Sequence, residues 1–105
     1  MDRKLFMFTR LAVLITALVL AACASAPVQE ISNARQAVVA AQQAGADQIA
    51  PRQMAEARRL LRDAQTALDE GDYSTSRQDA LHARDEAVKA LQISRRQGST
   101  GSSPP

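Results

Sequence analysis

Between residues 28 and 97, apolar side chains recur every three to four positions, which is the spacing of one face of an α-helix. Gly45, Pro51 and Gly71 interrupt this periodicity, and no segment shows the strict apolar–polar alternation of a strand. The pattern therefore predicts an all-α protein, a small antiparallel arrangement of three helices over about 28–44, 51–70 and 72–97.

Glycine and proline mark both breaks between these predicted helices. Gly45 suits the left-handed end of a helix, and Pro51 suits the first turn of the next one. Gly71 can end the second helix, and the side chain of Asp72 can then cap the third, which Tyr73 opens. We therefore expect Gly71, Asp72 and Tyr73 to form a turn and a helix cap.

The predicted apolar faces share one property, which is their high content of alanine. In the first helix the face consists of Val28, Ile31, Ala34, Val38 and Ala41. In the second it consists of Ala50, Met54, Ala57, Leu61, Ala64 and Leu68. In the third it consists of Tyr73, Ala80, Ala83, Ala87 and Ala90, flanked by Leu81, Val88 and Leu91. Alanine buries little surface but lets helices approach closely, so we expect a thin domain that associates with itself or with a protein partner through these faces.

A different pattern precedes the helical domain. Arg3, Lys4 and Arg10 form a basic start, and residues 11–22 then contain no charge. Twelve helical residues rise about 18 Å, well short of the ~30 Å hydrocarbon core of a bilayer, so a permanent membrane span is not expected. Residues 1–22 are predicted to be a cleaved signal peptide.

The only cysteine, Cys23, directly follows Leu20, Ala21 and Ala22. An aliphatic residue, two small residues and a cysteine resemble the lipobox of bacterial lipoproteins. The resemblance implies that the Cys23 thiol carries a diacylglycerol and that its new N-terminus carries an N-acyl chain, as palmitate or a similar fatty acid. Because Ala24 is not aspartate, the same resemblance implies the periplasmic face of the outer membrane.

Two further segments complete the predicted organisation of the chain. Residues 23–27 would be the lipidated tether, and residues 98–105, which lack any apolar side chain, would be a disordered tail. Ala22-Cys23-Ala24 also has the A-x-A form cut by the ordinary signal peptidase. Cleavage there would instead release a soluble periplasmic helical binding protein.

Charge and aromatic content argue against nucleic-acid binding. The signal peptide removes Asp2 with its three basic residues, which leaves ten basic and ten acidic residues in the mature chain. A neutral chain with one tyrosine and no tryptophan has neither the basic surface nor the stacking groups that nucleic acids need.

No catalytic or metal-binding arrangement is expected. His82 is the only histidine, and a metal site would need further histidine or cysteine ligands. The acidic residues within 69–72 could suggest calcium, but the twelve-residue calcium-binding loop is absent. Residues 74–76 carry hydroxyl groups but have no histidine base to activate them, so these three residues are expected to cap a helix. Apart from the covalent lipid on Cys23, we therefore expect no cofactor and no enzyme activity.

Arginines along the second predicted helix could suggest a phosphate or glycan site. Arg58, Arg59 and Arg62 are, however, interleaved with Glu56 and Asp63. Such interleaving is typical of a solvated, salt-bridged helix surface.

The order of short landmarks along the chain carries a family resemblance. Over about residues 27–97 the chain resembles bacterial lipoproteins with domain of unknown function 4398. The motifs that carry this resemblance are, in order, Ala44-Gly45-Ala46, Ala50-Pro51 and Glu70-Gly71-Asp72-Tyr73. The resemblance implies a helical periplasmic domain tethered to the outer membrane, in a family with no assigned activity. Some members carry a peptidoglycan-binding domain of the outer-membrane-protein-A type, which is not expected here, so peptidoglycan contact is possible but unsupported.

Two other interpretations stay open. The protein could be a cell-wall-associated coiled-coil lipoprotein resembling murein lipoprotein, although Gly45, Pro51 and Gly71 argue against one continuous helix. Residues 55–90 also resemble a single tetratricopeptide hairpin, but one copy falls short of the three that stack stably. The favoured hypothesis is a lipid-anchored structural or interaction module.

Overall fold

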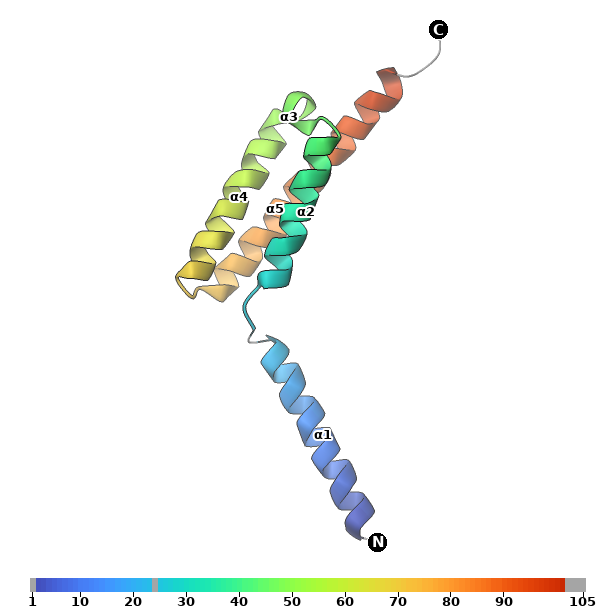
Figure 1. Ribbon diagram of the computed structural model, residues 1–105, viewed down its shortest axis with the longest axis vertical. Coiled ribbons are helices and arrows are strands. Elements are labelled where there is room, and N and C mark those ends of the chain that lie inside the picture. The colour runs from blue at the N-terminus through green and yellow to red at the C-terminus, as the bar shows by residue number, and fades with distance from the viewer. Residues whose placement is uncertain (1, 24, 102–105) are drawn as a thin grey trace.

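The computed structural model describes residues 2–23 and 25–101, with side chains over 2–17 and 25–99, and its regular elements are all α-helices (Figure 1). They are α1 (Asp2–Cys23), α2 (Val28–Gln43), α3 (Ala46–Ile49), α4 (Pro51–Asp69) and α5 (Tyr73–Gly101). The all-α prediction is confirmed. Within the described residues, the predicted three-helix arrangement is corrected to five helices, because the segment that ends at Cys23 is helical and the first break contains a helical turn of its own.

Backbone geometry explains the extra turn in the first break. Gly45 has a φ of 82°, the left-handed conformation that ends α2, and its N–H donates to the carbonyl of Gln42 at 3.0 Å. The four residues of α3 follow, a length too short to show a helical period in the sequence. Pro51 is the first residue of α4. Proline is tolerated there because an N–H in the first turn of a helix would have no helical acceptor.

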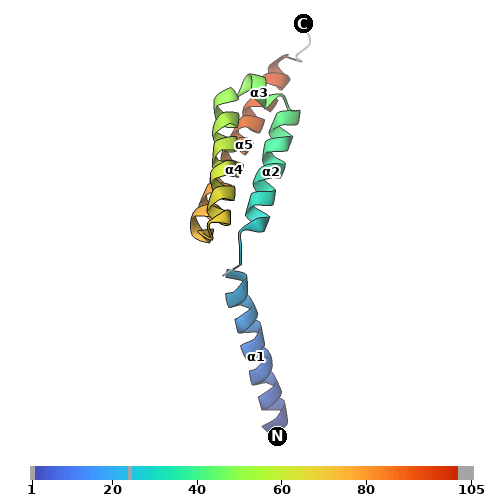
Figure 2. The ribbon, with the colours of Figure 1, turned by 60° about the vertical axis from the view of Figure 1, so that its left-hand side comes forward.

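Helices α2, α4 and α5 lie side by side, with α4 antiparallel to the other two (Figures 1 and 2). Helix α5 packs along both α2 and α4, and α3 closes one end of this bundle. Because α2 and α5 run in the same direction, both begin at the opposite end, beside the turn between α4 and α5. We call this the hairpin end, defined by Val28, residues 69–72 and Tyr73.

Helix α5 is longer than the sequence predicts and projects past α3 (Figure 1). It continues to Gly101, so residues 98–101 of the predicted disordered tail are helical, and residues 102–105 lie outside the described residues. A Cβ added at Gly98 would meet no atom within 4 Å, so no close contact requires glycine at this position. Glycine lowers the helix propensity there but does not end the helix.

Small side chains dominate the core of the bundle. Among the described residues, every buried apolar side chain is an alanine except Pro27, Ile31, Val38, Met54 and Leu60. The buried face of α5 contains no large side chain and consists of Ser76, Ala80, Ala83, Ala87, Ala90 and Ser94. A face of this kind allows close helix packing, and it confirms the alanine-rich seam on α5.

Several seam positions differ from the prediction. Val28 is 63% exposed and Tyr73 is 41% exposed, because each is the first residue of its helix and lies at the end of the bundle. On α4, Leu60 is buried while Leu61 and Leu68 are only partly buried. Helix α4 contacts both α2 and α5, so its buried face is wider than the two-position seam that the 3.5-residue period predicted.

Candidate functional site

The predicted lipobox lies at the C-terminal end of α1. The helix includes the backbone of Leu20, Ala21, Ala22 and Cys23, whose side chains lie outside the described ones. In the preceding part of α1 the large apolar side chains are exposed, and the hollows on this surface are lined by α1 alone. The part of α1 whose side chains the structure describes therefore presents an exposed apolar surface.

Basic residues near the start of α1 are also exposed. The guanidinium carbon of Arg10 lies 5.0 Å from the centroid of the Phe6 ring, within the range of a cation–π contact. Among the described residues, no helix combines the length and the apolar content needed to cross a bilayer.

The chain is fixed to the bundle two residues after Cys23. Arg77 on α5 donates from Nη2 to the carbonyl of Ser25 at 3.0 Å and from Nε to Oε1 of Glu30 on α2 at 3.2 Å. Pro27 is fully buried, so the second half of the predicted tether is part of the folded domain. Arg77 thus joins the tether to both helices that begin at the hairpin end. This role is not visible in the sequence, because Arg77 is one of many charged residues on its helix.

The predicted turn at Gly71, Asp72 and Tyr73 is present, and its hydrogen bonds explain it. Gly71 has a φ of 78°, and its N–H donates to the carbonyl of Leu68 while that of Asp72 donates to the carbonyl of Ala67. These two bonds form the Schellman ending of α4. Asp72 Oδ1 accepts from the N–H of Thr75 at 3.2 Å, which confirms Asp72 as the cap of α5.

Ser76 has a structural role that its position in the sequence did not predict. Residues 74–76 were expected to cap α5, but Ser76 is fully buried and its hydroxyl donates to the carbonyl of Ala64 at 2.7 Å. The detectable clue is spacing, since Ser76 lies four residues before Ala80 and continues the buried face of α5.

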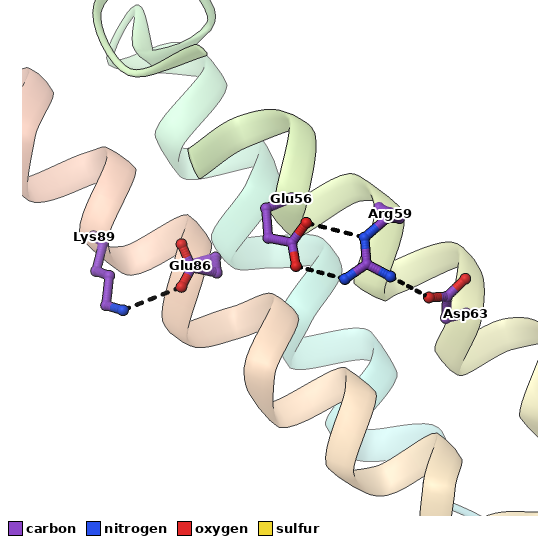
Figure 3. Close-up of polar contacts among 5 residues, drawn as sticks. All are labelled: Glu56, Arg59, Asp63, Glu86 and Lys89. Atoms are coloured by element: carbon purple, nitrogen blue, oxygen red, sulfur yellow. Dashed lines mark hydrogen bonds and ion pairs between the residues drawn. The ribbon is translucent and has the colours of Figure 1, made fainter. Parts of the chain in front are cut away.

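Ion pairs cover α4, as its interleaved charges predicted. Figure 3 shows Arg59 between two carboxylates, with Nε 2.9 Å from Oε2 of Glu56 and Nη1 2.8 Å from Oδ2 of Asp63. Arg58 makes two hydrogen bonds to Asp47 and so connects α3 with α4. The hydrogen bonds from these arginines lower the pKa of Glu56 and of Asp47 below their ordinary values.

The remaining polar candidates do not converge on a site. In Figure 3 a further pair, Lys89 and Glu86, lies on α5 with Nζ 3.1 Å from Oε1. His82 and Arg62 are exposed. Within residues 2–23 and 25–101, no group of three histidine, cysteine, aspartate or glutamate side chains is arranged to hold a metal ion.

Comparison with known proteins supports the family resemblance of the bundle. Searches of curated proteins and of solved structures found no match. The family model described as "Domain of unknown function (DUF4398)" matches residues 29–101, which include α2 from its second residue, all of α3 to α5 and most of the chain. The chain belongs to the DUF4398 family.

Proposed function

We propose that the protein is a lipoprotein anchored by acylated Cys23 to the periplasmic face of the outer membrane, with a helical domain that serves a structural or protein-interaction role and no catalytic one. The observation that carries this proposal is the order of a basic start, an uncharged segment and Leu20-Ala21-Ala22-Cys23. The family match begins only at residue 29, so the motif stands before the matched domain rather than within its packed helices.

Acylation would supply a durable anchor. A single acyl chain binds membranes only marginally, with an association constant of about 10⁴ M⁻¹, and stable attachment needs a second signal. A diacylglycerol and an N-acyl chain on Cys23 would together provide three chains. The anchor needs no membrane-spanning helix in the mature domain.

The architecture of the bundle favours a structural or interaction role. Its described large apolar side chains are mostly covered, and the clearly exposed ones are Val28, Val39, Tyr73 and Leu81. Because Gly45 and Gly71 let the chain fold back on itself, the domain is shorter than a continuous coiled coil of the murein-lipoprotein kind. This favours a compact module over a long rod toward the cell wall.

Intact mass spectrometry of the membrane-extracted protein tests the anchor. We expect the mass of a chain starting at Cys23 plus a diacylglycerol and an N-acyl chain, and no such addition in a Cys23→Ala control. A lipid-free chain starting at Ser25 would instead support the soluble alternative and overturn the proposal.

Membrane fractionation tests the location separately. The wild-type protein should separate with the outer membrane, and an Ala24→Asp variant, still lipidated, should shift toward the inner membrane. A lipidated wild-type protein found in the inner membrane would overturn the proposed location. Affinity capture from native membranes, with Cys23→Ala as the control, then tests whether the anchored bundle holds a partner.

A further inference from the structure

We infer that the hairpin end of the bundle lies against the lipid headgroups of the membrane that holds Cys23, so that α5 points away from the bilayer. This inference rests on the lipidation of Cys23 proposed above. It goes further, because a lipid anchor alone would allow the domain to move freely at the end of a flexible tether.

The tether between Cys23 and the folded domain is short. Arg77 holds the carbonyl of Ser25, and Pro27 is fully buried, so the folded domain begins two residues after Cys23. Two residues of fully extended chain span at most about 7 Å. An acylated Cys23 at the membrane surface would therefore keep the nearest part of the bundle within that distance.

The part of the bundle nearest to Cys23 is the hairpin end. Arg77 ties Ser25 and Glu30 to the first turns of α5, so the tether leaves the bundle at the hairpin end. Val28 and Tyr73, the first residues of α2 and α5, are two of the exposed large apolar side chains of the bundle. A tyrosine ring combines an apolar body with a polar hydroxyl, and such residues favour the water–lipid boundary.

Charge limits how deep this contact goes. Asp69, Glu70 and Asp72 are exposed at the same end. Carboxylates are costly in hydrocarbon, so these residues keep the hairpin end at the level of the headgroups. The resulting contact places Tyr73 at the bilayer surface and leaves the acidic turn hydrated.

The mature chain contains a built-in probe for this contact. Tyr73 is its only tyrosine, tryptophan is absent, and both phenylalanines precede Cys23. Tyr73 fluorescence can therefore be measured for the lipidated protein in vesicles of phosphatidylethanolamine and phosphatidylglycerol. Acrylamide in the water phase should quench it about twofold less than in the unlipidated Cys23→Ala protein mixed with the same vesicles, because one side of the ring faces the lipid.

A spacer variant provides the matched control. A flexible Gly/Ser segment inserted between Ala24 and Ser25 retains the lipid and the bundle but lengthens the tether. We expect acrylamide quenching of Tyr73 in this variant to return to the unlipidated level. If mass spectrometry confirms the lipid but Tyr73 of the wild type is quenched as strongly as in the spacer variant, the membrane contact is overturned and the anchor stands. If the lipid itself is missing, both proposals fall.

Discussion

The buried hydroxyl of Ser76 on α5 donates a 2.7 Å hydrogen bond to the main-chain carbonyl of Ala64 on α4. It is a direct polar link between the two helices that pack most extensively on each other. Because Ser76 occupies the first position of the buried face of α5, it fixes how α4 and α5 align near the turn that joins them.

Replacing this hydroxyl should weaken the bundle. Ser76→Ala removes one buried hydrogen bond, and we expect the free energy of unfolding to fall by about 0.5–1.5 kcal/mol. Ser94→Ala is the matched control, because the buried Ser94 hydroxyl bonds only within α5, to the carbonyl of Ala90. Urea unfolding of the unlipidated mature chain, followed by circular dichroism, would measure both. An equal loss in the two variants would contradict a specific role for the link between helices.

Two glycines should respond to alanine in opposite directions. At Gly71 an added Cβ meets no neighbour, but the φ of 78° is strained for alanine, so Gly71→Ala should destabilise by about 1–2 kcal/mol. Gly98 also has open space around it but lies in α5 without a positive φ, so Gly98→Ala should stabilise by at most about 1 kcal/mol. Thermal unfolding of the two variants would show the opposite signs. A loss of stability in both would contradict the backbone explanation.

The alanine core should not tolerate a larger side chain. Ala87 is fully buried between helices, so Ala87→Leu should cost about 1–3 kcal/mol through displaced neighbours. Ala55 is exposed on α4, and Ala55→Leu should leave the free energy of unfolding unchanged within about 0.5 kcal/mol. Denaturant titration compares the pair. A neutral Ala87→Leu would show that the helices are not closely packed at this position.

Acid should weaken the ion pairs of α4. The hydrogen bond from Arg59 lowers the pKa of Glu56 from its ordinary value of 4.5. A lowered pKa in the folded state adds stability above the ordinary pKa, and this contribution is lost as the pH falls through the folded value. The loss should therefore begin below about pH 4.5 and should be small, because the pair is exposed and screened by salt.

Direct titration would test this pair without relying on global stability. Carbon-detected NMR of the Glu56 carboxyl group should give a pKa that rises toward 4.5 in Arg59→Ala. Lys89→Ala serves as the control, since Lys89 pairs with Glu86 on another helix. An unchanged Glu56 pKa in Arg59→Ala would contradict the pairing.

The helices of the bundle were predictable because their limits are set by local chemistry. Gly45, Pro51 and Gly71 each act through their own backbone conformation, so their effects are visible in the sequence. The buried alanines of α5 were predictable for a similar reason, as their spacing repeats with the helix. The turn and cap at Asp72 followed from the same local rules.

The missed features depend on contacts between segments distant in sequence. Arg77 bonds to Ser25 and Glu30, which are far from it along the chain, so no periodicity identifies it. Leu60 is buried because α4 lies against two helices at once, and a seam pattern for a single partner selected Leu61 instead. The segment before Cys23 was expected to be a signal peptide, and that interpretation stays a prediction.

The parallel course of α2 and α5 separates the two ends of the folded domain. Many domains have their termini close together, whereas here the chain enters at the hairpin end and leaves beyond α3. The 29 residues of α5 rise about 44 Å between these points. Any fluorescent tag or fused domain placed after Gly101 would therefore lie far from Cys23. Inserting the whole bundle into a surface loop of another protein would force the two ends of that loop apart.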